Sequence, residues 1–432
     1  MILTKNNYFN ILLGLVPLSF IAGNMLININ IILIILLSLI FFGKDLFKIN
    51  FFLIDKLLFL FFFLILATGI INDYYFYSIK LSWKGYYATI LKSILFTKYL
   101  LLYISLRYLL EKNILNLKLF FISCFFGSLF VSFDIFFQFM NGKDIFGYEG
   151  IKNNLAGPFG NELIAGGYIQ RFSIFSFFLI PLYYHKNFSK YYKYLVPILF
   201  LVFLITIILS GNRMPLLLYL FAISLIVIFN KQTRKFFFPT LIVASLIFYL
   251  FIKINPKVYE NYRAFYAQVS KMTVIIIERD IKNNYVPPYF GQFLTFYDTW
   301  LMHKYIGGGI KNFRYYCHKR PNIEKGAKNV CNMHPHNYYL EILTETGAIG
   351  FLIITLSFLI IIYLTFVKKY FFASNLNKNK IIIPFLFLFL AEIFPLKSTG
   401  SFFTTGNATY LFILMGILIG FIRKENLIEN KS

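Results

Sequence analysis

Long apolar segments recur along the whole chain, separated by short polar connectors and by one long polar segment. A membrane-spanning helix needs roughly 20 mainly apolar residues, and the pattern fits about twelve such helices. We expect them at 8–22, 26–43, 52–71, 89–109, 119–140, 163–184, 195–210, 215–229, 236–252, 338–367, 381–396 and 407–422. The first is interpreted as a span because no small-residue cleavage site of a signal peptide follows it.

These segments divide the chain into four parts. Residues 1–252 hold spans one to nine, 253–337 form a long polar loop, 338–422 hold the last three spans, and 423–432 form a short polar tail. No internal repeat and no separate soluble domain interrupts this order. The pattern therefore predicts an all-α polytopic membrane protein with one long loop between spans nine and ten.

Composition and charge agree with a membrane protein. Of the 432 residues, 59% are hydrophobic, 21% are aromatic and only 14% are charged, which lies outside the range of ordinary soluble domains. A net charge of +24 would suggest nucleic acid as a partner of a soluble protein. Here most basic residues lie in short connectors, where they orient a protein in the bilayer. We therefore expect membrane lipids around the chain and no nucleic acid.

The basic residues gather in alternate connectors. If the N-terminus is cytoplasmic, the cytoplasmic connectors hold Lys44, Lys48, Arg107, Lys112, Lys118, Lys186, Lys190, Lys193, Lys231, Arg234, Lys235, Lys368, Lys369, Lys378, Lys380, Arg423 and Lys424. Because positive charge favours the cytoplasmic side, both termini are predicted there. The loop 253–337 and the segments 72–88, 141–162, 211–214 and 397–406 are predicted outside.

The end of the long loop is the first candidate site. This loop holds four of the five histidines and more basic than acidic residues, so its surface should attract anions. His334, Pro335 and His336 close it and lead directly into an apolar helix. A catalytic imidazole could meet a lipid at this junction.

Cys317 and Cys331 lie in the same loop. Outside the cytoplasm a disulfide can form and persist, and such a bridge would pin the strand that leads to His336. Zinc is an alternative, with these cysteines and the neighbouring histidines as ligands. The spacing is irregular and lacks a CxxC, so a disulfide is favoured over zinc or free thiols.

Arg213 lies in the break between two spans, within the sequence Ser210-Gly211-Asn212-Arg213-Met214-Pro215. The structural alternative is a snorkelling arginine at a helix end. The functional interpretation is a guanidinium whose fork geometry suits bidentate contact with phosphate. Pro215 would open the next helix, whose free N–H groups add to the attraction of anions. Together these features predict a diphosphate clamp.

Arg171 falls about two turns inside the sixth span. An ionisable group at that depth normally faces the bundle interior with a partner, and Asp134 and Glu162 are candidates. Ligand binding is the alternative to an internal ion pair. Glu392 and Lys397, near the outer end of the eleventh span, raise the same question. The glycine run 307–309 lacks the ending of a phosphate loop and is interpreted as a turn.

Four segments together resemble a known family. They are GPFGNELIAGGYIQRF at 157–172, SGNRMP at 210–215, GGGIKNFRYYC at 307–317 and CNMHPHNYYLEILTETGAIG at 331–350. They are similar to the O-antigen ligases and polymerases, a superfamily of bacterial membrane glycosyltransferases. His336, Asn337, Gly347 and Gly350 fit the ligase pattern of His, then Asn, Ser or Gln, nine residues, Gly, two residues, and Gly, Thr or Tyr.

The resemblance implies transfer of a glycan, the O-antigen, from undecaprenyl diphosphate to lipid A-core in lipopolysaccharide biosynthesis. It implies an inverting enzyme on the periplasmic face of the bacterial inner membrane, without metal, nucleotide or other cofactor. His336 would match the family's general base, and Arg213 the arginine that holds the diphosphate. The family has a further loop arginine, for which Arg279 is the first choice and Arg263 the second.

Supporting roles and rival functions stay open. Asn337 and Glu341 either orient His336 or the sugar, or cap and solvate the helix start, and Arg171 is a further supporting candidate. The nearest rival is the polymerase activity of the same superfamily; attachment of glycan to protein is another. A transporter or flippase for the lipid-linked glycan belongs to a different class, but transporters commonly contain inverted repeats, and we find none.

Overall fold

The computed structural model describes residues 5–75, 88–151, 154–229, 241–243, 245–246, 249–250, 253, 256–278, 288–321, 331, 336–371 and 381–429. Within these residues the protein is all-helical, with two isolated β-bridges and no strand. The main helices are α1 (Lys5–Ala22), α2 (Asn24–Phe42), α3 (Leu53–Tyr75), α5 (Ala88–Phe96), α6 (Lys98–Glu111), α7 (Lys118–Asn141), α8 (Ala165–Leu179), α9 (His185–Leu209), α10 (Arg213–Phe229), α12 (Pro256–Glu278), α13 (Pro288–Trp300), α14 (Phe313–Tyr316), α15 (Tyr338–Ile362), α16 (Ile382–Glu392) and α17 (Thr405–Glu429).

Several of these helices are long and apolar enough to cross a membrane. The described residues contain 6 such candidates, at Asn24–Phe47, Leu53–Tyr74, Ala88–Glu111, Lys118–Asn141, Tyr338–Lys368 and Thr405–Glu425. Shorter apolar helices lie at Tyr194–Leu209, Arg213–Phe229 and Ile382–Glu392. A helical membrane protein is therefore confirmed. Helices occupy every predicted span except the ninth, most of which lies outside the described residues, and the number that cross the bilayer stays a prediction.

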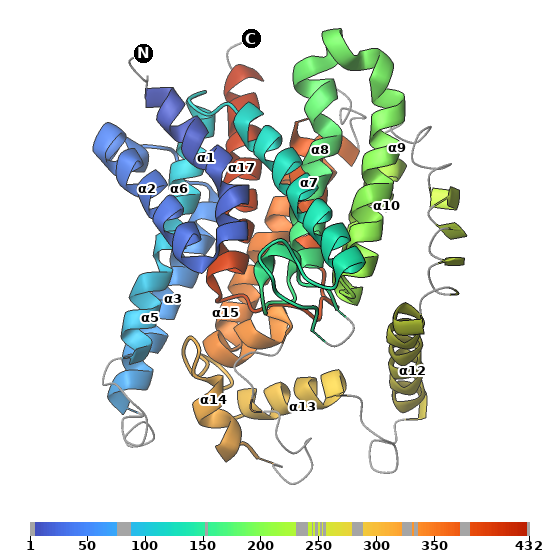
Figure 1. Ribbon diagram of the computed structural model, residues 1–432. Helices are drawn as coiled ribbons and strands as arrows, with labels where there is room; N and C mark the ends of the chain where they lie inside the picture. The colour runs from blue at the N-terminus through green and yellow to red at the C-terminus, as the bar shows by residue number, and fades with distance from the viewer. Residues whose placement is uncertain are drawn as a thin grey trace.

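The helices form a bundle with a distinct outer part. Both ends of the chain lie at one end of the bundle, and α12, α13 and α14 of the predicted loop lie at the other (Figure 1). The α7–α8 and α9–α10 connections and the start of α15 also face that second end. The described segments that hold Arg213, the disulfide and His336 therefore gather at one end of the bundle, as the predicted topology requires, although orientation in a membrane stays a prediction.

Close packing of α17 against α6 fixes the centre of the bundle. Gly416 and Gly420 lie one turn apart on α17, where a Cβ would come within 3.2 Å of Tyr103 and 2.8 Å of Leu110, respectively. Small residues at this spacing let two helix backbones approach closely, which is common in membrane proteins. Aromatic rings fill the surrounding core, for example Phe62 stacked on Phe96 at 5.6 Å between centroids.

Four charged residues at the end nearest the termini are buried rather than solvated. Arg107 is fully buried and pairs with Asp55, whose carboxylate also accepts the Tyr103 hydroxyl at 2.7 Å. Arg423 Nε donates to Glu111 at 3.0 Å. The sequence pattern treated both arginines as connector charges, but they join α3, α6 and α17 through internal ion pairs. Buried charges require such partners.

Candidate functional site

The start of α15 is built around Asn337. Its side-chain oxygen accepts the backbone N–H groups of Tyr339 and Leu340 at 3.0 and 3.1 Å, which makes Asn337 the N-cap of the helix. His336 precedes it with a backbone φ of 55°. A left-handed conformation is uncommon for a residue with a side chain, so the surrounding structure must hold the imidazole-bearing residue in place.

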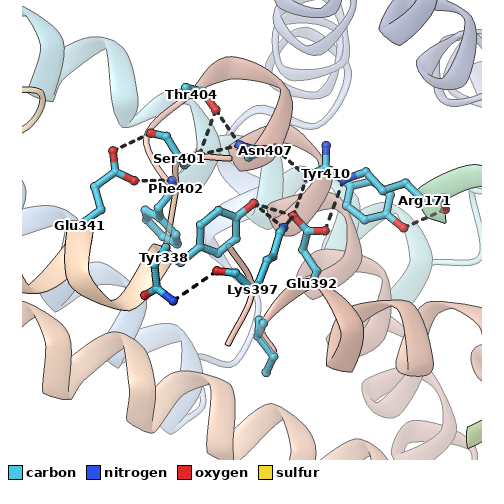
Figure 2. A network of polar contacts seen from close by, with 12 residues as sticks. Arg171, Tyr338, Glu341, Glu392, Lys397, Ser401, Phe402, Thr404, Asn407 and Tyr410 are labelled. Atoms are coloured by element: carbon cyan, nitrogen blue, oxygen red, sulfur yellow. Dashed lines mark hydrogen bonds and ion pairs between the residues drawn. The ribbon is translucent and has the colours of Figure 1, made fainter. Parts of the chain in front are cut away.

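The loop between α16 and α17 holds this helix start from the side. The amide of Asn337 donates to the carbonyls of Pro395 and Lys397 at 2.8 and 3.2 Å. One turn further on, Glu341 accepts the hydroxyl of Ser401 and the N–H of Phe402, both at 2.5 Å (Figure 2). Asn337 thus caps the helix, and Asn337 and Glu341 together attach it to this loop.

A buried charge cluster lies beside these contacts. Arg171 on α8 donates to Glu392 through Nη2 at 2.7 Å and Nε at 3.3 Å, and Nη2 also reaches Asn407 at 2.6 Å. Lys397 Nζ donates to the same Glu392 oxygen at 2.6 Å, and the hydroxyl of Tyr338 does so at 2.5 Å (Figure 2). Arg171, Lys397 and the first residue of α15 therefore share one carboxylate.

The expected partners of Arg171 were wrong. Asp134 accepts the backbone N–H of Ile145 at 2.8 Å instead, and Glu162 is exposed. The distant Glu392 could not be chosen as the partner from sequence, because only the fold brings the middle of α8 to the end of α16. The sequence did contain one signal of a polar site here. The polar segment 397–407, which contains Ser401 and Asn407, lies between two apolar spans.

The cluster carries more positive than negative charge. Glu392 is fully buried, while the side chains of Arg171 and Lys397 are 15% and 4% exposed. The pKa of Lys397 is lowered to about 8, mainly by burial; Glu392 opposes this shift and repulsion from Arg171 adds to it. Near neutral pH two cations thus face one carboxylate. Such a surplus suits a site that attracts an anion.

The glycine run of the outer loop docks on α15. The N–H groups of Gly308 and Gly309 donate to the carbonyls of Thr344 and Glu345 at 3.0 and 2.9 Å. In return, the N–H of Ala348 donates to Lys304 at 2.8 Å. This exchange requires the kink at Gly347, whose φ is 68° and whose missing side chain leaves room for the backbone of Tyr305.

The same part of the outer loop is fixed to α3 and α5. Tyr316 donates its hydroxyl to Asn72 at 2.7 Å, and Asn312 donates its amide to Thr89 at 2.9 Å. These four side chains are buried. The loop segment is therefore held between α15 on one side and the α3–α5 pair on the other, with its backbone polar groups satisfied.

Cys317 and Cys331 form a disulfide in the structure, with 5.5 Å between their Cα atoms. Arg320 donates to the carbonyl of Cys317 at 2.7 Å and lies 3.2 and 3.3 Å from the two sulfurs. Bridged sulfurs lack the thiolate that a zinc ligand needs. The bridge packs against stacked Phe296 and Phe313, whose ring centroids are 3.5 Å apart.

Arg213 is the first residue of α10 and is half-buried. The turn before it is closed by Asn212, whose amide donates to the Ser210 carbonyl at 2.9 Å. The start of α8 packs tightly on this turn, since a Cβ on Gly166 would lie 2.6 Å from the Ser210 hydroxyl. Arg171 lies on the same helix, so α8 connects the Arg213 turn to the charge cluster beside α15.

Comparison with known families agrees with this geometry. Residues 198–355 match the family model described as O-antigen ligase. This segment is similar to the O-antigen ligases. The resemblance to the O-antigen ligase and polymerase superfamily is therefore confirmed. Among the curated proteins, none matches the chain.

The matched segment contains Arg213, the disulfide and His336, but it ends before the charge cluster is complete. Glu392 and Lys397 lie after it and Arg171 before it. Glu392 accepts from Tyr338 and the Lys397 carbonyl accepts from Asn337, whereas Arg171 is linked to this helix start through Glu392. The remaining site residues predicted from sequence do not belong to this cluster. Arg263 is exposed on α12, 4.0 Å from Glu260. Arg279 and His334 lie outside the described residues.

Proposed function

We propose that this protein is a glycosyltransferase that moves a glycan from undecaprenyl diphosphate to lipid A-core in lipopolysaccharide biosynthesis. The observation that carries the proposal is the O-antigen ligase match, because it spans both Arg213 and His336. The bundle supports it further, since the segments that hold these two residues face the same end (Figure 1).

The proposed reaction is a single displacement with inversion. His336 takes the proton from an acceptor sugar hydroxyl, whose oxygen then attacks the anomeric carbon of the donor glycan. The bond between that carbon and the diphosphate oxygen breaks, and undecaprenyl diphosphate leaves with the electron pair. Because the diphosphate already activates the donor, the proposal needs no metal ion, nucleotide or other cofactor.

Fixed positive charge would stabilise the leaving group. Arg213 at the start of α10 is the proposed diphosphate ligand, since its guanidinium can bind two phosphate oxygens at once and the helix N-terminus favours anions. A loop arginine would supply the second contact, with Arg279 as the first choice. Arg171 contributes to the positive surplus nearby, while Asn337 and Glu341 hold the helix that carries His336.

The proposed setting is the bacterial inner membrane, with both termini in the cytoplasm and the site on the periplasmic face. The apolar helices support a membrane location. The shared position of both termini, opposite α13 and α14, is compatible with this topology. The polyprenyl chain of the donor would then enter sideways between helices while its glycan stays in the aqueous phase.

The test is transfer in membranes from cells that lack their own ligase. Intact protein is compared with His336→Ala and Arg213→Ala at equal expression, and glycan on lipid A-core is scored. His318→Ala, an exposed histidine of the same loop, is the matched control. We expect the intact protein and the control to modify the core, and the two site variants to lose at least about 100-fold in rate.

Other outcomes distinguish the rival functions. If the core stays unmodified while the carrier-linked glycan lengthens, the protein is a polymerase. If neither product forms but lipid-linked glycan redistributes across the membrane, it is a transporter. Equal activity of intact protein and His336→Ala would reject the proposed base.

A further inference from the structure

The disulfide of the outer loop lies directly against the helix start that carries His336. Phe296, Phe313 and Cys317 form a small buried core, and Cys331 and Leu340 pack against it. Leu340 belongs to the first turn of α15, whose cap is Asn337. The bridge therefore shares one small core with the first turn of α15, and Cys331 stands five residues before His336 in the sequence.

A second set of contacts completes a closed ring. From Cys317 the chain runs back to the glycine run, where Gly308 and Gly309 donate to Thr344 and Glu345 of α15 at 3.0 and 2.9 Å. From Cys331 it runs forward to His336 and enters the same helix. The disulfide joins these two paths, so the first turns of α15 are enclosed between a covalent link and a set of backbone hydrogen bonds.

The ring explains how an unfavourable backbone at His336 can persist. A φ of 55° is costly for a residue with a Cβ and is retained only where neighbours fix it. On one side Asn337 is fixed by its cap and by the carbonyls of Pro395 and Lys397. On the other side, the first turn of α15 packs through Leu340 against the core that contains the disulfide.

We propose that the Cys317–Cys331 disulfide is a positioning element for His336, which makes catalysis depend on an oxidised outer loop. This inference rests on the proposed function of His336 as a general base. Arg320 assists by holding both sulfurs and the Cys317 carbonyl. Reduction by dithiothreitol converts the bridge to two thiols with two electrons and two protons, while the reagent becomes its cyclic disulfide.

The test uses full-length protein in detergent or membranes, in three forms: oxidised, treated with dithiothreitol, and as the Cys317→Ser/Cys331→Ser variant. Misplacing a catalytic group by about 1 Å can cost about 100-fold in rate. We expect kcat to fall between about 10- and 100-fold in the second and third forms. The KM for the lipid-linked donor should stay within about twofold, because the Arg213 turn is held by α8 and Asn212 instead. Cys124→Ser, at the free cysteine buried in α7, is the matched control.

Reduction of the folded protein separates positioning from failure to fold. Dithiothreitol should lower the oxidised protein to the level of the double serine variant and leave that variant unchanged. Amide hydrogen exchange supplies a readout independent of transfer: exchange in 336–345 should accelerate on reduction, whereas exchange in α7 should not. An unchanged kcat, or a loss confined to KM, would overturn the proposal.

The exchange result also keeps this inference apart from the proposed function. If the oxidised protein transfers no glycan but exchange in 336–345 accelerates on reduction, the proposed function fails and the bridge still positions this helix start. If transfer falls on reduction while exchange in 336–345 is unchanged, the proposed function stands and the positioning role is rejected.

Discussion

Arg171 and Glu392 lie 221 residues apart in sequence and form an ion pair with two hydrogen bonds, of 2.7 and 3.3 Å, between α8 and the end of α16. Through Tyr338 and Lys397 the same carboxylate reaches the start of α15 and the α16–α17 loop. This contact therefore joins parts of the chain on both sides of the segment that matches the O-antigen ligases.

Glu392→Gln should destabilise the protein strongly, because it leaves Arg171 and Lys397 buried without a carboxylate. Removing one partner of a buried pair typically costs about 3–5 kcal/mol. The measurement is thermal unfolding of purified protein in detergent. Glu149→Gln is the matched control, since it breaks an exposed pair with Lys143 whose side chains are 72% and 60% exposed. Such surface pairs contribute about 1 kcal/mol or less, so equal effects of the two variants would contradict this account.

Much of the fold could be predicted from sequence, because a lipid bilayer dictates both the length of the apolar segments and their helical conformation. A bilayer requires helices whose backbone is satisfied internally, and the apolar runs locate them. The exact ends of the helices were harder to predict. The predicted span at 195–210 belongs to a helix that begins at His185, because residues between two spans can continue a helix when no glycine or proline stops it.

The site was predictable where a motif acts locally and unpredictable where the fold pairs distant residues. Asn337 before a helix and Arg213 after a break are visible in the sequence. The pairing of Arg171 with Glu392 is not, because periodicity says which face of a helix is polar but not which helix it meets. Gly347 was noted as part of a motif, yet its physical role, the kink that receives the 307–309 run, needed the structure.

Gly347→Ala should disrupt the docking of the outer loop. At a φ of 68° an added Cβ is strained, and it would also collide with the backbone of Tyr305. A conformation of this kind costs a non-glycine residue roughly 1–3 kcal/mol before the collision is counted. We expect lower unfolding temperature and faster amide exchange at 304–312. Gly167→Ala on α8 is the control, because nothing lies within 4 Å of its added Cβ, and a matching loss there would reject this explanation.

Two substitutions at Asn337 separate its two roles. Asn337→Asp keeps the oxygen that caps α15 but replaces the amide that donates to Pro395 and Lys397. Asn337→Ala removes both and should lose about 1 kcal/mol from the cap alone. We expect both variants to lower transfer, and amide exchange of Tyr339 and Leu340 to accelerate in the alanine variant more than in the aspartate variant. Full transfer by Asn337→Asp would show that the amide contacts do not position His336.

The stability of the cluster should depend on pH through Lys397. Its pKa is about 8 in the folded protein, against 10.5 for an ordinary lysine. Below about pH 8 both folded and unfolded chains carry the proton, so this group adds no pH dependence. Between these two values the unfolded chain binds a proton that the folded protein has released, so rising pH favours the folded state.

The comparison that isolates this effect is wild type against Lys397→Met, unfolded thermally at several pH values from about 7 to 10. The difference in unfolding temperature should shift in favour of the wild type as pH rises above about 8, since only the wild type carries this titrating group. Lys48→Met is the control: Lys48 is exposed, and its pKa is raised by Asp45, so its comparison with wild type should stay flat over this range. A flat profile for Lys397→Met as well would mean that Lys397 keeps its proton throughout, which would leave two permanent cations beside Glu392.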